Sequence, residues 1–328
     1  MKLLHLAALF AAVQALPSNP LPRQSCTSPK LRKSWTQATV AERLAYLEAA
    51  VCVTQTPSRL GNANATLHDD FALTHALLSF PQQIHGVAAF LPWHRYFVQV
   101  YEDALHSCGY TGTAMYWDWV ADSSNPTQSA VWDPITGFGG NGTGPPQSLG
   151  RAPRVMDGPF ANYSPRYWGP DVDPHGLCRN WVEGIPGNPD QMDMHAHRYT
   201  PAAVQSVMDL TTFVDFAREL EGGPHSAVHF GVGGGGPRIG PAGDLGWNDA
   251  SPNDPIFFLH HTQVDRLWWL WQQEDVARTS EYEGFRNLPD GSQVEATLDD
   301  VLPMGDLAPP AVVRDYMDAS AANLCYTY

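Results

Sequence analysis

Two histidines four residues apart, His225 and His229, begin the stretch of the chain with the clearest chemistry. Side chains at this spacing lie on one face of a helix, with Cβ atoms about 5–6 Å apart, so both imidazoles can reach one metal ion. A third ligand can come from the adjacent pair His260 and His261. The Asp-Pro dipeptide upstream of that pair is typical of an N-cap followed by a first-turn proline, and it predicts a second helix that faces the first.

Of the adjacent pair, His261 is the preferred ligand. Asp265 lies four residues further on and can accept a hydrogen bond from its ring, which would fix the tautomer. Val264, four residues after His260, offers no such bond, so His260 is expected to support the site without binding the metal. Zinc is the alternative metal, but the first pair lacks the glutamate of the His-Glu-x-x-His motif of zinc proteases. Each histidine taken alone is more often a hydrogen-bonded, half-buried side chain.

A second set of histidines lies upstream. His75 is expected near the end of one helix, His85 in the loop that follows Pro81, and His94 at the start of the next helix. Three imidazoles can therefore meet where two helices and their connection come together. Neutral imidazoles suit copper, which heads the affinity series of the divalent first-row metals. The chain thus carries two sets of three histidines.

Helices must position both sets. Thr39 and Glu42 form a capping box at the start of one predicted helix, and others are predicted at about 67–78, 93–106 and 212–220. Residues 122–201 are rich in Pro, Gly, Asn and Asp, but their aromatic residues indicate ordered loops packed over a helical core. The Gly-rich segment 231–243 has no following Lys-Ser/Thr and is not interpreted as phosphate-binding. The expected fold class is mainly α, with long ordered loops and few short strands.

Net charge and targeting signals restrict the binding partners and the cellular location of the protein. The 328 residues carry a formal net charge of −15, which disfavours nucleic-acid binding because that binding needs clustered Lys and Arg. Residues 1–16 have the features of a secretory signal peptide, and residues 17–24 those of a proline-rich lead-in or short pro-segment. No other apolar run approaches the roughly 18–20 residues that cross a membrane. We therefore expect a secreted, extracellular protein, and the sequons at Asn64, Asn141 and Asn162 agree with that route.

Five cysteines in an oxidising compartment predict two disulfides and one leftover thiol. The pairing we favour is Cys26 with Cys325, which would tie the chain ends, and Cys52 with Cys108, which would tie two helices. Sequence alone leaves other pairings open. Cys178 is then the unpaired cysteine.

Four segments match a known pattern. They are His85-Gly-x-x-x-Phe-Leu-Pro-Trp-His94-Arg-Tyr, Tyr116-Trp117-Asp118-Trp119, Leu220-Glu221-Gly followed by His225-x-x-x-His229, and Asp254-Pro-x-Phe-x-x-His-His261-x-x-x-Asp265-Arg-Leu-Trp. These segments resemble the type-3 copper proteins, which comprise tyrosinases, catechol oxidases and the functional units of molluscan hemocyanin. The resemblance implies a core of four helices that holds two copper ions, with O2 as co-substrate and small phenols as substrates. The implied ligands are His75, His85 and His94 for the first copper, and His225, His229 and His261 for the second.

The resemblance also bears on the activity. Tyrosinases hydroxylate monophenols with a glutamate, matched here by Glu221, and an asparagine, in whose place this chain has Ser226. A serine polarises a water less firmly, so we expect a catechol oxidase that converts o-diphenols to o-quinones. Tyrosinase or o-aminophenol oxidase activity is the alternative, and an O2 carrier is less favoured. Phe257 and Phe230 are expected to border the substrate, although both could be core aromatics, and Glu221 could be a surface carboxylate.

The chain ends soon after these motifs, as in the short secreted fungal members of the family. Residues 25–328 are accordingly expected to form one copper domain without the C-terminal lid domain of long tyrosinases. Some relatives carry a cysteine joined to the second ligand of the first copper. Ser79 and Gln83 stand near that place here, so no thioether is expected.

Overall fold

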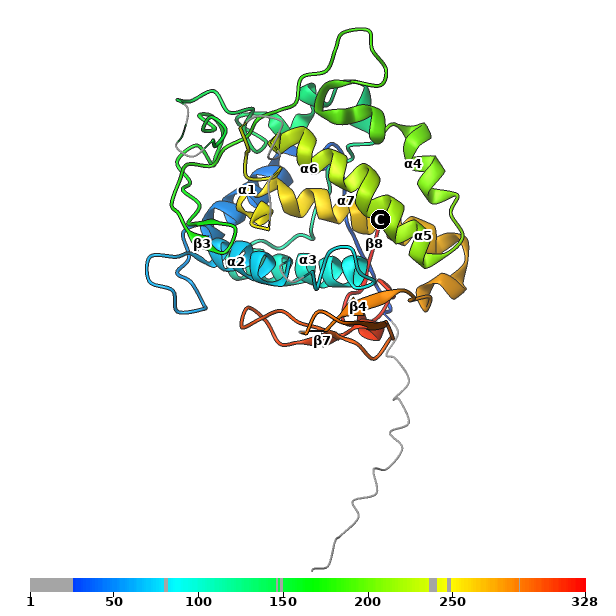
Figure 1. Ribbon diagram of the computed structural model, residues 1–328. Coiled ribbons are helices and arrows are strands. Elements are labelled where there is room, and N and C mark those ends of the chain that lie inside the picture. Colours follow the sequence, from blue (N-terminus) through cyan, green and yellow to red (C-terminus); the bar gives the residue numbers. More distant parts are fainter. Residues whose placement is uncertain are drawn as a thin grey trace, which may run out of the picture.

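Four helices form the centre of a mainly helical fold (Figure 1): α2 (Leu67–Ser79), α3 (Phe90–Ser107), α6 (Ser226–Gly233) and α7 (Ile256–Glu274). The computed structural model describes residues 26–79, 82–145, 147, 150–235, 241–246, 249–288 and 290–328. The expected signal peptide and lead-in, residues 1–24, lie outside the described residues. The mainly α fold class is confirmed.

Three further helices surround this centre: α1 (Val40–Val53), α4 (Pro201–Met208) and α5 (Phe213–Leu220). The capping box at the start of α1 is present, with both of its reciprocal bonds between Thr39 and Glu42. The disulfide Cys52–Cys108 ties α1 to the end of α3. Within the described residues, no helix combines the length and the apolar character that a membrane crossing requires.

Helix α5 runs into α6 through a wider π-helical turn, Glu221–His225. Pro224 lies inside this turn, and it lacks the N–H of a regular helical hydrogen bond. Such turns are rare and often occur at functional sites. The consequence here is that His225 and His229 lie on one continuous helical segment, as their spacing predicts.

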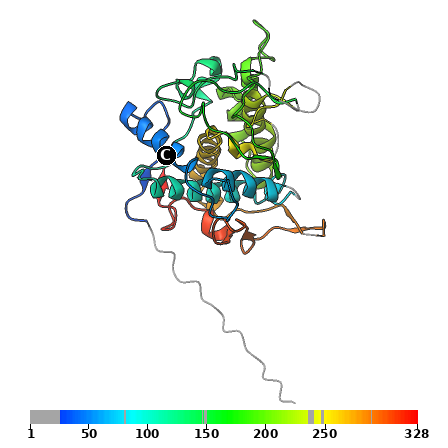
Figure 2. The same ribbon diagram turned by 90° about the vertical axis from the view of Figure 1, so that its left-hand side faces the viewer.

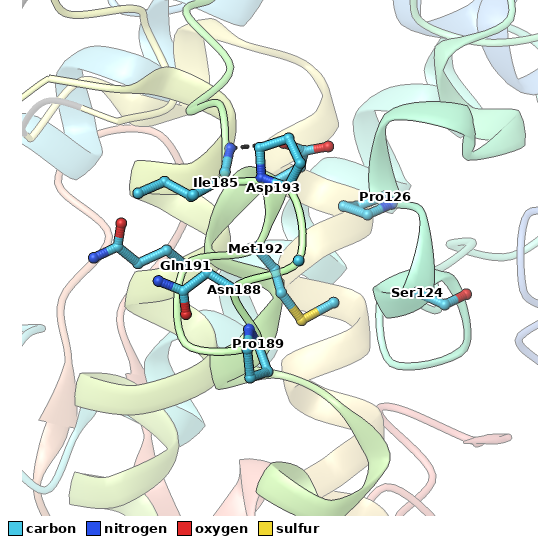
Figure 3. A pocket seen from close by; sticks show the side chains of 11 residues that line it. Ser124, Pro126, Ile185, Asn188, Pro189, Gln191, Met192 and Asp193 are labelled. Carbon is cyan, nitrogen blue, oxygen red and sulfur yellow. Dashed lines mark hydrogen bonds between the residues drawn. The ribbon is translucent and has the colours of Figure 1, made fainter.

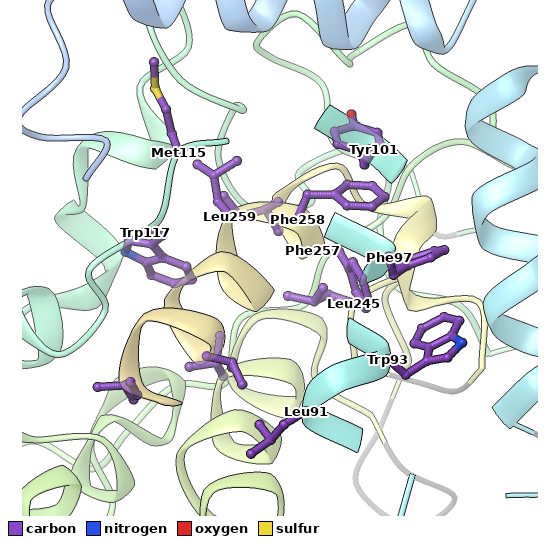
Figure 4. Close-up of a cluster of buried hydrophobic side chains, with 14 of the residues drawn as sticks. Leu91, Trp93, Phe97, Tyr101, Met115, Trp117, Leu245, Phe257, Phe258 and Leu259 are labelled. Carbon is purple, nitrogen blue, oxygen red and sulfur yellow. The ribbon is translucent and has the colours of Figure 1, made fainter. Parts of the chain in front are cut away.

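The aromatic core lies between α3 and α7 (Figure 4). Tyr101 of α3 stacks on Phe258 of α7 with ring centroids 3.4 Å apart, and Phe97 lies 6.0 Å from Phe257. All four side chains are almost completely buried. Burying each such ring contributes about 1.5–3 kcal/mol, so this contact fixes α7 against α3, the two helices that carry His261 and His94.

The strands are short and occur in pairs. β1 (Lys30–Leu31) pairs in parallel with β8 (Tyr326–Thr327). Three antiparallel pairs join β2 (Tyr167–Trp168) to β3 (Asp171–Val172), β4 (Phe285–Asn287) to β5 (Gln293–Glu295), and β6 (Val301–Leu302) to β7 (Ala311–Val312). Short 3-10 turns cover Ala121–Ser124, Pro126–Gln128, Ala130–Trp132, Asp193–Arg198, Ser251–Asn253, Val276–Thr279 and Val313–Tyr316.

The segment after α7 lies along α3, beneath it in Figure 1 and again in the turned view of Figure 2. Trp93 donates from Nε1 to Pro303 O over 2.6 Å, and the Tyr96 hydroxyl donates to Pro309 O over 2.6 Å. The disulfide Cys26–Cys325 joins the two ends of the described chain. Both predicted disulfides are therefore confirmed, and the remaining Cys178 is free and buried.

The described residues between 122 and 201 form ordered loops over the helices, as predicted. Trp132, Phe138 and Phe160 from these loops are buried. Arg179 is fully buried and donates to the carbonyls of three consecutive residues, 138–140, and to both carboxylate oxygens of Asp254. Because Asp254 lies two residues before the start of α7, this pair anchors the loops to the helix. The N-cap predicted at this residue is only partly realised, by one 3.2 Å bond from Ile256 N.

Candidate metal centre

The first histidine set converges as its spacing predicts. His75 comes from α2, His94 from the first turns of α3, and His85 from the loop between them. One ring nitrogen from each lies within 4.8 Å of the others. The three rings have centroid separations of 5.0, 5.1 and 5.6 Å. This arrangement leaves the nitrogens close enough to share one ion.

Backbone carbonyls hold two of these rings in one orientation. His75 Nδ1 lies 2.5 Å from Asp249 O, and His94 Nδ1 lies 2.7 Å from Phe90 O. An Nδ1–H that donates to a carbonyl leaves Nε2 unprotonated and able to bind a metal. The Nε2 atoms of both rings are buried without a hydrogen-bond partner. His85 Nδ1 lies 3.2 Å from Ser79 Oγ, so a side chain has the corresponding role there.

Backbone carbonyls also hold two rings of the second histidine set through Nδ1. His225 Nδ1 lies 3.0 Å from Glu221 O, and His229 Nδ1 lies 2.8 Å from Leu245 O. The Nε2 atom of His225 has no partner, and that of His229 lies 3.4 Å from His261 Nε2. His260 also belongs to this group, and each member offers a nitrogen within 4.8 Å of the others.

The adjacent histidines of α7 face different neighbours. His261 stacks on His94 with centroids 4.3 Å apart and an interplanar angle of 11°, so it lies between the two sets. His260 stacks on His225 at 5.2 Å and lies beside Trp119 at 6.1 Å. The two sets are therefore in direct contact through His261.

The hydrogen bond predicted between the Asp265 carboxylate and the His261 ring is not formed, so this prediction is wrong. The Asp265 carboxylate accepts instead from Arg95, Arg32 and Tyr326, and His261 Nδ1 has no partner within the described residues. Side chains on a helix lean toward its N-terminus. The His261 ring accordingly lies against Phe257, at 4.2 Å, and not toward the following turn.

Burial keeps these imidazoles neutral. It lowers the pKa of His75 to about 3 and that of His229 to about 4, and it also lowers the pKa of each of the other five, His85, His94, His225, His260 and His261. A neutral imidazole is the form that binds metals. Buried nitrogens without partners otherwise destabilise a fold. The donor set therefore fits two nitrogen-preferring transition-metal ions such as copper.

A cavity of about 280 Å³ opens above both sets. Phe230, which is 41% exposed, and Ser226 line it together with His85 and His229. Phe257 does not line this cavity, because it is fully buried between His75 and His261. The sequence allowed Phe257 to border the substrate or to be a core aromatic. The structure shows a core aromatic, so Phe257 does not border the cavity as expected. Phe230 lies where it was expected.

Glu221 lies beside the loop of His85. Its Oε1 accepts from Gly86 N over 2.8 Å, and burial raises the pKa of its carboxyl group to about 7 although the Gly86 bond lowers it. The carboxylate borders a neighbouring, mostly apolar cavity of about 170 Å³ with Phe213 and Phe285. Ser226 Oγ donates to Glu221 O over 2.7 Å, so this hydroxyl is engaged by the backbone.

Several groups that hold the site had no signal in the sequence. The carbonyls of Asp249 and Leu245 come from a loop that follows the Gly-rich segment. Because every residue has a backbone carbonyl, the sequence does not indicate which carbonyls accept the bonds from the histidine rings. Ser79 was considered only as a position that lacks the cysteine of a thioether. The i, i+4 spacing of Ser79 from His75 on α2 could have indicated a contact, and the structure gives 3.4 Å from Oγ to His75 Nδ1.

Two other features resemble sites but offer no comparable chemistry. A cavity of about 520 Å³ lies between residues 124–126 and the loop 184–193 (Figure 3), and its acidic residue Asp193 is engaged by Gly184 N. The buried group of His175, Cys178 and Asp244 is satisfied internally. One Asp244 oxygen lies 2.9 Å from His175 Nε2, and the other accepts from Cys178 N over 2.9 Å.

Comparisons with known proteins agree with this geometry. Residues 65–274 match the family model described as the common central domain of tyrosinase. The chain is 38% identical over 325 residues to the tyrosinase-like protein phomQ1' of Diaporthe leptostromiformis, covering 94% of this chain and 82% of that protein.

Solved structures give the same result for the fold. A polyphenol oxidase variant from Thermothelomyces thermophila superposes with a TM-score of 0.76 at 28% identity, covering 94% of this chain and 90% of that one. A functional unit of octopus hemocyanin has a TM-score of 0.56 at 20% identity, with coverages of 91% and 68%, and thus shares the fold. The chain therefore belongs to the tyrosinase family of type-3 copper oxidases.

Proposed function

We propose that this chain binds two copper ions and oxidises o-diphenols to o-quinones while reducing O2 to water. The observation that carries the proposal is the pair of facing imidazole sets, in which the Nε2 atoms of His75, His94 and His225 are buried without a hydrogen-bond partner. We assign His75, His85 and His94 to one copper, and His225, His229 and His261 to the other. Two diphenols give two quinones, and their four electrons and four protons convert one O2 to two waters.

The protein's own part is to hold neutral ligands and to admit the substrate. When bound, the two coppers supply O2 binding and electron transfer. Four carbonyls fix the ring tautomers of His75, His94, His225 and His229. Phe230, at the mouth of the cavity, offers an aromatic face to the phenol ring.

Oxidation of diphenols is favoured over hydroxylation of monophenols because Ser226 is engaged. Its hydroxyl donates to the Glu221 carbonyl, so it is not free to donate to a water that would take the phenol proton. The second candidate, a tyrosinase, is favoured by Glu221 itself. A carboxyl group whose pKa is about 7 suits a general base near neutral pH.

Metal analysis joined to oxygen uptake tests the proposal. Purified protein should contain two coppers per chain and consume O2 with 4-methylcatechol. Turnover of the matching monophenol, 4-methylphenol, would favour the tyrosinase, and turnover of 2-aminophenol would add an aminophenol oxidase. Reversible O2 binding without turnover would indicate a carrier. One metal per chain, or zinc in place of copper, would contradict the proposal.

We further propose that the protein is secreted and that residues 25–328 act as one copper domain. Asn64 and Asn162 are exposed, which supports their use as glycosylation sites. Asn141 is half-buried, and its Oδ1 accepts from Gly142 N and Trp181 N, so it is less suited to carry a glycan. Mass analysis of protein from the culture medium, before and after removal of N-glycans, tests whether the protein is secreted and whether these sequons carry glycans.

A further inference from the structure

One carboxylate at the cavity above the histidines has no partner among the residues that the structure describes. Asp249 is half-buried and lines this cavity. Its backbone carbonyl holds His75, but within the described chain its side chain has neither a hydrogen bond nor an ion pair. A half-buried charge without a counterion is unfavourable in the free protein. It becomes favourable when a cation binds beside it.

The rest of the cavity lining suits the same cation. Phe230 presents an exposed ring from α6, and the face of an aromatic ring attracts an ammonium group. Among the described residues, the lining of this cavity contains no lysine or arginine. The chain's net charge of −15 adds a field that attracts cations.

We infer that Asp249 makes this site selective for phenols whose side chain ends in a protonated amine. The inference rests on the proposed function, because it concerns the substrate of the same site. The phenol ring enters above the histidines, and the ammonium group pairs with the Asp249 carboxylate and contacts Phe230. A phenol with a carboxylate side chain meets the same negative charge and is disfavoured.

Three diphenols with the same ring test this selectivity. Dopamine carries an ammonium group, 4-methylcatechol is neutral, and 3,4-dihydroxyphenylacetate carries a carboxylate. The copper-loaded enzyme should have the highest kcat/KM for dopamine and the lowest for the acid. In Asp249→Asn the ratio of kcat/KM for dopamine to that for 4-methylcatechol should fall about fivefold, mainly through KM, as expected for a partly exposed ion pair.

Matched variants separate this effect from general damage. Asp249→Glu keeps the charge and should keep most of the preference. Glu48→Gln removes one negative charge from an exposed position on α1, which is tied to the far end of α3 from His94. It should leave the ratio unchanged. Raising the ionic strength should lower the wild-type preference, because salt screens the pair.

The outcomes distinguish the two proposals. Oxidation of 4-methylcatechol without a preference for dopamine over the acid would overturn the role of Asp249 and leave the oxidase intact. Absence of oxidation of all three diphenols by copper-loaded protein would overturn the proposed function. If Asp249→Asn does not fold, the salt dependence of the wild-type ratio decides, and a ratio that does not change with salt counts against the inference.

Discussion

Arg95 donates from Nε to Asp265 Oδ1 over 2.5 Å in the interior, between α3 and α7. Arg95 directly follows His94, and Asp265 lies one helical turn after His261, so this ion pair connects the helices of the two histidine sets. Burial alone would raise the pKa of Asp265, but the charges of Arg95 and Arg32 outweigh it and lower that pKa. The pair therefore holds the two halves of the site together.

Replacing Asp265 with Asn should strongly destabilise the fold. The variant leaves the buried guanidinium groups of Arg95 and Arg32 without their shared carboxylate, and breaking such a buried pair costs about 3–5 kcal/mol. Urea denaturation measures this loss. Glu274→Gln breaks an ion pair between the last residue of α7 and Arg278 in the following 3-10 turn, in which the Glu274 side chain is 53% exposed, and should cost less than about 1 kcal/mol. Equally small losses in both variants would contradict a structural role for the buried pair.

The sequence predicted the histidine sets because their spacing is local. His225 and His229 share a helix face, and the residues around His94 and His261 match a family pattern. The partners of Asp265 could not be predicted in this way. Arg32, Arg95 and Tyr326 come from distant parts of the chain, and only the packing of β1, α3 and β8 brings them together.

Burial was equally hard to predict for single aromatic residues. Phe257 and Phe230 both lie next to histidines in space, yet one is fully buried and the other is 41% exposed. Phe257 belongs to the part of α7, residues 256–265, in which every side chain is buried, whereas Phe230 faces outward from the short α6. Sequence periodicity gives the face of a helix, but it does not give what covers that face.

His261→Ala should remove one copper and nearly all oxidase activity, because the ring lies between the two sets, stacked on His94. His260→Ala should keep both coppers and lose about 10- to 100-fold in activity or affinity, as residues that support metal ligands do. Copper content and oxygen uptake of the two variants give the answer. The reverse pattern would mean that His260 is the ligand.

Ser79→Ala should loosen the first copper. His85 comes from a loop, and its Nδ1 is held by Ser79 Oγ at 3.2 Å. Without this hydroxyl the ring can rotate, so copper should be lost to a chelator about tenfold faster. Ser79→Thr keeps the hydroxyl and should restore slow loss. Ser107→Ala, at the end of α3 that is far from His94, removes a bond to Ala104 O and a long bond from Arg59, and it should behave as the wild type. Equal rates in all variants would exclude this role of Ser79.

The copper-free protein should lose stability as the pH falls below about 6.5, the ordinary pKa of histidine in an unfolded chain. Burial lowers the pKa of His75 to about 3 and that of His229 to about 4 in the folded state. Below pH 6.5 the unfolded chain therefore binds more protons than the folded one, and each proton taken up shifts the equilibrium toward unfolding.

The loss approaches about 1.4 kcal/mol per pH unit for each such histidine until the folded pKa is reached. Urea midpoints of copper-free protein should therefore fall between pH 6.5 and 4.5 and change little from pH 7.5 to 6.5. His75→Gln removes one of these groups, so its midpoint should fall less steeply over the same interval. A midpoint that stays constant down to pH 4.5 would show that the imidazoles are already charged or exposed in the folded protein. That result would contradict the buried, neutral ligand set on which copper binding depends.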